Sequence, residues 1–290
     1  MHKLTQVSGI ILLAALVSFG ATRLFPASGA TVVKAKESGF ERVMRTGILR
    51  CAYLIYPPET IKDPNTGKLS GTTVETTEEV ARQLGLKVEW TAEVGFQDMF
   101  EGFKTGRYDA FCSGVWEMPG RTREALFTIP WNYGASYTFV RADDTRFDDS
   151  LDAINDPNVK IAQLDGEAGQ IIADENYPKA GRYLLPPLND ISHVLEAVAT
   201  RKADVAFLQI GSGRGYLKSN PGKLKIIRKA AARAFPAPLI ALRHGDYDLK
   251  YILDAAMRTL QENGFVERVL RKYDPDLDSY LLVAKPYQAR

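Results

Sequence analysis

Short apolar runs and stretches of helical periodicity alternate along the chain from Gly39 onward. The run GILRCAYLIYPP at 47–58 predicts a strand and a loop, and the apolar stripe of VETTEEVARQLG at 74–85 predicts a helix that ends at Gly85. Strand, helix and strand then follow in KVEWTAEV at 87–94, FQDMFEGFKTG at 96–106 and YDAFCSG at 108–114. Strands that alternate with helices of this length indicate βαβ units around a parallel sheet, so this part of the chain is predicted to be an α/β unit.

The same alternation restarts after the acidic stretch RADDTRFDDSLDAIND at 141–156. Strand, helix, strand, helix and strand are predicted in VKIAQLDG, EAGQIIADENY, GRYLLP, DISHVLEAVATRK and ADVAFLQIG, all within 159–211. A second α/β unit is therefore expected. The segment at 238–276 reads as one strand and two helices, which is too little for a third core, so it is expected to pack on an existing one.

The N-terminus has a basic start followed by an apolar run, Val7–Ala21, that is shorter than the roughly 20 residues needed to span a bilayer. This pattern is typical of an export signal, and the small residues Ser28-Gly29-Ala30 predict a signal peptide at 1–30 and a periplasmic location. Arg23 leaves an uncleaved membrane anchor as the alternative. No cysteine directly follows the run, which argues against lipid attachment.

Composition and charge narrow the function classes. With 290 residues, 45% hydrophobic and 25% charged, the chain suits about two globular domains. Loss of 1–30 removes Lys3 and Arg23 and no acid, so the formal net charge of +2 falls to 0. Nothing in this balance points to a nucleic-acid partner or an anionic membrane surface.

Two cysteines, Cys51 and Cys112, each lie inside an apolar run. Export permits a disulfide, but the preferred interpretation is that both are buried small hydrophobic residues with free thiols. The three histidines, His2, His193 and His244, are scattered without paired His/Cys spacing, so neither a metal site nor a cofactor is expected. His193 is predicted to lie on a helix surface.

The stretch GVWEMPGRTREALFTIPW at 114–131 breaks a local stability rule. A Pro-Gly turn leads into Arg121 and Arg123 at the start of a predicted short helix, where a positive charge costs roughly 0.3–1 kcal/mol. Because such departures often mark functional sites, an anion is expected to offset the charge.

The order of motifs resembles the type-2 periplasmic solute-binding proteins of the polar amino-acid ABC transporter family, bacterial extracellular solute-binding protein family 3, from about Thr46 to Tyr273. The stretch LRCAYLIYPPETIKDPNTGKLSGTTVETTEEVARQLG is similar to the family's first strand, Tyr-Pro-Pro loop, hairpin and first helix. The similarity continues in FKTGRYDAFCSGVWEMPGRTREALFTIPW, VKIAQLDGEAG, ATRKADVAFLQ and TLQENGFVERVLRKY.

The resemblance implies an α/β fold of two lobes, each a mostly parallel sheet flanked by helices, joined by a two-stranded hinge. Lobe 1 would comprise 40–134 and 236–290, and lobe 2 would comprise 135–235. It further implies a monomeric receptor without enzymatic activity that closes on a small carboxylate-bearing solute, an amino acid or related organic acid. Such a receptor would deliver its ligand to the ABC transporter permease in the inner membrane.

By the same resemblance, Arg121 takes the position that grips a ligand carboxylate, for which a guanidinium fork is well matched. Tyr56 takes the position of an aromatic laid against the ligand. Backbone groups of Gly114 and those near Trp116 would line the same pocket. The Trp116 ring would either stack on a flat ligand or turn into the core. Arg123 is expected to be solvated.

The second lobe departs from the family pattern at two positions. Where the family has Gly-Thr-Thr, this chain has Gly166-Glu167-Ala168. Where the family has an acidic residue that accepts the ligand's ammonium, this chain has Gln209. Glu167 would either face the cleft and restore the charge or only complement a helix dipole. The ligand is thus either an amino-bearing carboxylate held by Glu167 or a carboxylate without an amine held by Arg121 and Gln209. Loop or N-cap roles are the simpler interpretation of Asp165 and Asp190.

Two further function classes stay open. A periplasmic enzyme of the cyclohexadienyl dehydratase type has the same fold, and Glu167 is the candidate general acid. A membrane-anchored sensing module is the third hypothesis, ranked below both because the chain shows no output segment. A hydrolase is disfavoured because no Gly-x-Ser-x-Gly elbow occurs.

Overall fold

A computed structural model describes residues 37–186, 190–227 and 233–283 of the chain. From Ser38 onward, the described residues form one compact unit. The predicted signal peptide at 1–30 lies outside the described residues. Within the described ranges, no helix has both the length and the apolar character to cross a membrane.

The first sheet has the strand order β4-β1-β5-β13-β6. β1 pairs in parallel with β4 and β5, whereas β13 runs antiparallel to β5 and β6. Its strands are β1 (Ile48–Tyr53), β4 (Lys87–Glu93), β5 (Ala110–Phe111), β6 (Leu126–Phe127) and β13 (Ala241–Leu242). A two-stranded hairpin stands apart from it, formed by β2 (Ile61–Lys62) and β3 (Leu69–Ser70). The three strands predicted for the first α/β unit are confirmed as β1, β4 and β5, and so is the hairpin that the family resemblance implied.

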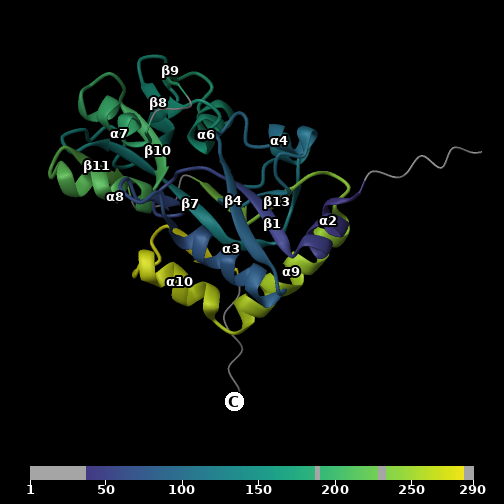
Figure 1. Ribbon diagram of the computed structural model, residues 1–290. Helices are drawn as coiled ribbons and strands as arrows, with labels where there is room; N and C mark the ends of the chain where they lie inside the picture. Colours follow the sequence, from purple (N-terminus) through teal and green to yellow (C-terminus); the bar gives the residue numbers. More distant parts are fainter. Residues whose placement is uncertain (1–36, 187–189, 228–232, 284–290) are drawn as a thin grey trace, which may run out of the picture. The chain divides into compact units, whose positions relative to one another are not determined.

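Helices cover both faces of the first sheet. Leu49 and Cys51 of β1 face a core that includes Val80 and Leu253, whereas Ala52, beyond a bulge, faces the opposite core with Phe103. The helices are α2 (Gly39–Thr46), α3 (Thr72–Gln83), α4 (Glu101–Thr105), α5 (Pro119–Thr122), α9 (Tyr247–Glu262) and α10 (Phe265–Tyr273). Figure 1 shows α9 and α10 beside α3, so the C-terminal segment packs on an existing core, as predicted.

Two predicted helix boundaries have different outcomes. Helix α3 ends just before Gly85, whose φ of +68° is the left-handed conformation that glycine favours at a helix end, so this prediction is confirmed. The helix expected at 96–106 is wrong in length, since only Glu101–Thr105 is helical. The Asp98 carboxylate accepts a hydrogen bond from the Gly95 N–H at 2.7 Å, which holds this segment in a turn ahead of the helix.

The second sheet has the strand order β11-β7-β10-β8-β9. β8 is parallel to β9 and β10, and β7 is antiparallel to β10 and β11. Its strands are β7 (Pro130–Arg141), β8 (Lys160–Leu164), β9 (Gly181–Leu185), β10 (Val205–Gln209) and β11 (Leu224–Ile227). The helical segments of this part are η1 (Leu151–Ile154), α6 (Ala168–Asn176), α7 (Ser192–Ala199) and α8 (Ile210–Ser219). Helix α6 packs on one face and α7 on the other, which confirms the second α/β unit.

Two long antiparallel strands connect the sheets. β7 leads from the first sheet into the second, and β12 (Arg233–Pro238) returns along it towards β13. A third strand, β14 (Tyr280–Leu282), pairs with the start of β7, opposite Asn132–Gly134. The chain therefore crosses between the sheets twice. The sequence did not predict β14, which pairs with one of the two crossing strands, β7.

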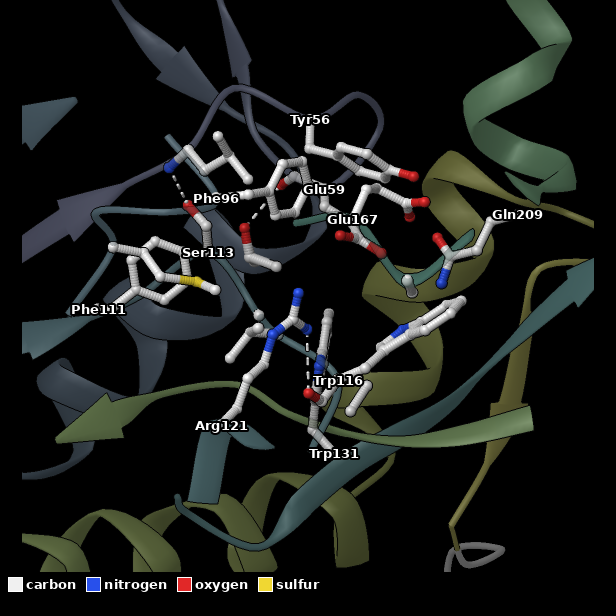
Figure 2. A pocket seen from close by; sticks show the side chains of 17 residues that line it. Tyr56, Glu59, Phe96, Phe111, Ser113, Trp116, Arg121, Trp131, Glu167 and Gln209 are labelled. Atoms are coloured by element: carbon white, nitrogen blue, oxygen red, sulfur yellow. Dashed lines mark hydrogen bonds between the residues drawn. The ribbon is translucent and has the colours of Figure 1, made fainter. Parts of the chain in front are cut away.

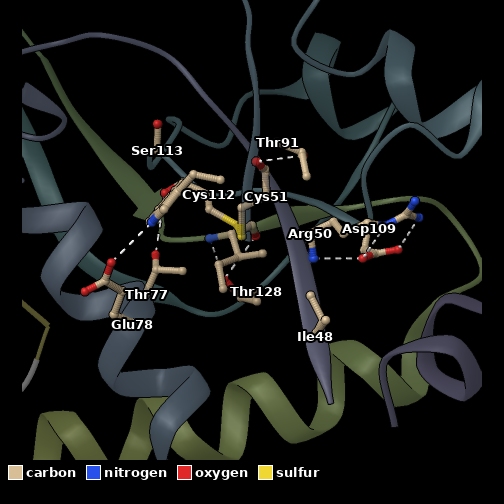
Figure 3. The surroundings of a disulfide bond; sticks show 12 residues. Ile48, Arg50, Cys51, Thr77, Glu78, Thr91, Asp109, Cys112, Ser113 and Thr128 are labelled. Carbon is tan, nitrogen blue, oxygen red and sulfur yellow. Dashed lines mark hydrogen bonds and ion pairs between the residues drawn. A yellow bond between two sulfur atoms is a disulfide. The ribbon is translucent and has the colours of Figure 1, made fainter. Parts of the chain in front are cut away.

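The interpretation of the two cysteines as free thiols is wrong. Cys51 and Cys112 form a disulfide, and both residues are fully buried (Figure 3). The parallel pairing of β1 with β5 sets Cys51 opposite Ala110, so that Cys112, two residues on, comes within a Cα–Cα distance of 5.6 Å. This distance lies in the usual range for disulfides, and it depends on a strand register that the sequence does not state.

Candidate functional site

One pocket gathers all six residues that the sequence singled out. It lies where the ends of β1 and β5 and the start of β7 approach β8 and β10, and its lining includes Tyr56, Gly114, Trp116, Arg121, Glu167 and Gln209. Figure 2 shows the Arg121 guanidinium pointing toward the side of the pocket that carries Tyr56, Glu59 and Glu167. Ligand binding by these residues stays a prediction, but their convergence from distant parts of the chain makes this pocket the candidate site.

Arg121 lies on the single-turn helix α5, which Pro119 starts with a φ already suited to a helix. Its side chain is buried, and it donates hydrogen bonds to the carbonyl oxygens of Gly166 at 2.9 Å and Trp116 at 3.2 Å. Burial lowers the pKa of Arg121 to about 10, while the nearby Glu167 raises it. Arg123 ends the helix and is exposed, as expected.

Glu167 satisfies both interpretations that the sequence left open. It is the N-cap of α6, where its carboxylate accepts a hydrogen bond from the Gly169 N–H at 2.5 Å. It is also buried and lines the pocket. Burial raises the pKa of Glu167 to about 7, and this shift is limited by the Gly169 N–H and by the charge of Arg121. A helix cap therefore places a titratable carboxyl inside the site.

An aromatic pair forms one wall of the pocket. The rings of Tyr56 and Phe96 meet edge to face, with centroids 5.9 Å apart at an interplanar angle of 84°. Burial raises the pKa of Tyr56 well above its usual value, so its hydroxyl is neutral and can donate a hydrogen bond. Phe96 was not predicted as a pocket residue from the sequence, because the pattern at 96–106 indicated a helix. Its position directly after β4, in Val-Gly-Phe, could have marked it as a residue at a strand end.

Glu59 is a second residue that sequence reasoning missed. It follows the cis Pro57–Pro58 bond and lines the pocket. Burial raises the pKa of Glu59 to about 8; a hydrogen bond with the Gln209 side chain lowers it, and the nearby Glu167 carboxylate raises it further. A glutamate in a loop is usually solvated. The available signal was its position three residues after Tyr56, in the same loop.

Gln209 and Trp116 pack together over the glycine of a crossing strand. A Cβ atom at Gly134 would lie 2.4 Å from Trp116 Nε1 and 2.5 Å from Gln209 Nε2, so only glycine allows this approach. Trp116 also stacks on Phe235 of β12, with centroids 4.5 Å apart at 19°. The ring of Trp116 thus lines the pocket while it packs on the core. The buried Oε1 atom of Gln209 accepts no hydrogen bond from the described residues.

Asp165 and Asp190 are the residues for which the sequence predicted loop and N-cap roles. Asp165 lies in the loop after β8 and accepts a hydrogen bond from the Gln97 side chain. Asp190 accepts a hydrogen bond from the Ser192 N–H at 2.7 Å at the start of α7, and His193 on that helix is exposed. These placements confirm the loop interpretation of Asp165 and the helix-surface interpretation of His193. The N-cap interpretation of Asp190 is wrong, because Ile191 is the N-cap of α7 and Asp190 lies one residue ahead of it. Among the described residues, no cluster of three His, Cys, Asp or Glu side chains could hold a metal ion.

Known proteins share this fold and parts of this sequence. A Haemophilus influenzae probable amino-acid ABC transporter-binding protein is 26% identical over 74% of this chain and 79% of its own length. The cyclohexadienyl dehydratase of Pseudomonas aeruginosa is 27% identical over 60% of this chain and 63% of its own length. The crystal structure of the ancestral amino acid-binding protein AncCDT-1, a precursor of cyclohexadienyl dehydratase, superposes with a TM-score of 0.71 at 23% identity, covering 82% of this chain and 99% of that one.

These similarities agree with the architecture of two sheets and their crossing strands. The fold is that of the two-lobed, type-2 periplasmic binding proteins, as expected from the sequence. The expectation of mostly parallel sheets is wrong, because β13 is antiparallel to its neighbours in the first sheet and β7 to its neighbours in the second. The family model of the bacterial extracellular solute-binding proteins, family 3, matches residues 49–275, the same stretch in which the motifs were recognised. The chain belongs to the bacterial extracellular solute-binding proteins of family 3.

Proposed function

We propose that this protein is a periplasmic receptor of an ABC transporter that binds a small solute carrying both a carboxylate and an amine. One observation carries the proposal: the guanidinium of Arg121 and the carboxyl of Glu167 line the same buried pocket. A zwitterion presents one charge of each sign, and burial makes an unpaired charge costly. The two side chains therefore favour a ligand with complementary charges.

Arg121 is suited to the carboxylate end of the ligand. Its present partners are two backbone carbonyl oxygens, and no described acidic side chain forms an ion pair with it. A ligand carboxylate would replace these neutral acceptors with charge-assisted hydrogen bonds, which are roughly twice as strong. The carboxylate end would then lie near α5.

The amine end is assigned to Glu167. The sequence left open a carboxylate without an amine, but such a ligand would add a third negative group beside Glu59 and Glu167. An ammonium would instead lower the pKa of Glu167 from about 7 and pair with its charged form. The unpaired Oε1 atom of Gln209 would accept a further N–H hydrogen bond from the ligand.

Domain closure is proposed to complete the site. The lobe bounds follow the sequence expectation, with 40–134 and 236–290 in lobe 1 and 135–235 in lobe 2. Two contacts join opposite walls of the cleft: Arg121 donates to the carbonyl of Gly166, and Gln97 donates to Asp165. We infer that ligand binding strengthens this closed arrangement, since the ligand contacts both lobes.

Export, a monomeric state and delivery to an inner-membrane permease complete the proposal. The apolar run at 7–21 supports a cleaved signal peptide at 1–30. The name of the Haemophilus influenzae relative supports an ABC transporter as the partner. A chain that begins near Thr31 after export is the expected result of N-terminal sequencing, whereas an intact 1–30 segment would indicate the anchored alternative.

Isothermal titration calorimetry on protein stripped of ligand by unfolding and refolding tests the binding assignment. The panel comprises amino acids, simple amines and carboxylates without an amine. We expect tight binding without turnover, lost by about 2–5 kcal/mol in Arg121→Ala and in Glu167→Gln. Arg123→Ala, which removes an exposed arginine two residues away, is the matched control and should bind as the wild type does. Unchanged affinity in Arg121→Ala would contradict the carboxylate assignment.

A dehydratase is the second candidate function. The relative from Pseudomonas aeruginosa supports it, and so do the pocket carboxyls of Glu59 and Glu167, whose raised pKa values leave them partly protonated near neutral pH. Incubation of the protein with a cyclohexadienyl compound, followed by chromatography, distinguishes the two functions. Loss of water from this compound, abolished in Glu167→Gln, would establish the enzyme, whereas an unconverted compound supports the receptor.

A further inference from the structure

Glu59 is a partly buried acidic residue of the pocket that the proposed zwitterion leaves without a partner. It comes from the loop between β1 and β2, and its carboxyl lines the same pocket as Arg121 and Glu167. Within the described part of the chain, no lysine or arginine forms an ion pair with Glu59. The nearby titratable groups are Glu167, Tyr56 and Tyr280, and none of them supplies a positive charge.

The charges of the pocket do not balance for a ligand with one ammonium. Arg121 pairs with the ligand carboxylate and Glu167 with its α-ammonium, so a neutral side chain on the ligand would leave Glu59 to be either charged and unpaired or protonated. An unpaired carboxylate is disfavoured in a pocket that a bound ligand closes off from water. A second cation on the ligand removes this imbalance, because each charge of the pocket then has a partner.

The surroundings of Glu59 also suit a cation. The Gln209 side chain lines the pocket with Glu59 and favours its charged form, since it lowers the pKa of Glu59. The rings of Tyr56 and Phe96 stand next to it at an edge-to-face angle, and aromatic faces attract cations. A purely structural role for the carboxyl is less suited to this position, because Glu59 is the N-cap of no described helix and its carboxyl lines the pocket.

We propose that Glu59 is a specificity-determining residue that holds a second cationic group, and that the ligand is a dibasic amino acid with a guanidinium or ammonium on its side chain. The assignment rests on the proposed receptor function. Arg121 and Glu167 would hold the amino-acid end, common to all such ligands. Glu59 would select for the charge at the other end.

Two isosteric ligand pairs test the proposal by calorimetry. L-Arginine carries a charged guanidinium where L-citrulline has a neutral urea. L-Lysine carries an ammonium where L-2-aminoheptanoic acid has a methyl group. We expect wild-type protein to bind the charged member of at least one pair tenfold or more tightly than its neutral partner. In Glu59→Gln this preference should fall to less than threefold, because affinity for the charged member is lost while affinity for the neutral member changes little.

Control variants separate the proposal from the function on which it rests. Glu79→Gln removes a surface glutamate paired with Arg82 and should leave the preference intact. Glu167→Gln and Arg121→Ala should weaken both members of a pair alike. Equal affinities for both members in wild-type protein, or a preference that survives in Glu59→Gln, would overturn the role of Glu59 alone. Failure of all four amino acids to bind would overturn the receptor assignment as well.

Discussion

Removal of the Cys51–Cys112 disulfide is expected to destabilise the protein without changing the shape of the site. The bond joins β1 to the residue after β5, and the two neighbouring backbones already pair, with the Cys112 N–H donating to the Ala52 carbonyl at 2.9 Å. Thr91 donates to the Cys51 carbonyl at 3.2 Å (Figure 3). These contacts persist in a reduced protein, so the main effect of the disulfide falls on the unfolded chain.

The size of the effect follows from the length of chain that the bond encloses. The cysteines are 61 residues apart, and the chain-entropy model gives about 4 kcal/mol for a loop of that length. Measured values are commonly lower, so we expect reduction to cost about 2–4 kcal/mol. For a chain of this size, that loss corresponds to a fall in the melting temperature of roughly 5–15 °C.

Thermal and urea unfolding of oxidised and reduced wild-type protein measure this difference on an unchanged sequence. Because the bond is buried, the reduced form is prepared by unfolding in reductant and refolding. Cys51→Ala/Cys112→Ala serves as the control, and the same reductant should leave its unfolding midpoint unchanged. Coincident midpoints for oxidised and reduced wild type would refute the reasoning, since they would mean that the bond does not restrict the unfolded ensemble.

Three further predictions concern the site. Arg121→Lys keeps the charge but loses the guanidinium fork, so ligand affinity measured by calorimetry should fall at least tenfold; wild-type affinity would show that charge alone suffices. Gly134→Ala should lower the free energy of unfolding measured in urea by about 1–3 kcal/mol and weaken ligand binding, because its Cβ would meet Trp116 and Gln209. The control, Gly215→Ala, has open space around its Cβ and should be neutral or stabilising. Glu59 and Glu167 have pKa values raised above the usual 4.5, to about 8 and about 7, so the stability they contribute is complete below pH 4.5 and is lost as the pH rises to 8. The melting temperature of the ligand-free protein should therefore fall between pH 5 and 9. In Glu59→Gln it should fall less, because this variant removes up to about 5 kcal/mol of the pH dependence. Parallel profiles of melting temperature against pH for the two proteins would contradict a contribution from Glu59.

Periodic patterns in the sequence determined the secondary structure and much of the fold. The alternation of apolar runs with helical stripes predicted both α/β units, since one-sided burial imposes a period on each element wherever it lies in the fold. The Pro-Gly turn ahead of Arg121 and the departures at Glu167 and Gln209 were likewise visible, because each breaks a local rule or a family pattern. All three side chains line the pocket.

Tertiary structure alone decided which distant residues meet. The disulfide depends on the register of β1 against β5, and the presence of Glu59 and Phe96 in the pocket depends on how the loops after β1 and β4 approach α6 and β10. Neither the strand register nor the position of these loops leaves a periodic signal in the sequence, since loop residues have no fixed spacing and a glutamate in a loop is normally solvated. The charge of the site therefore had to be read from the folded chain, because burial and the proximity of two carboxyls arise only when the sheets come together.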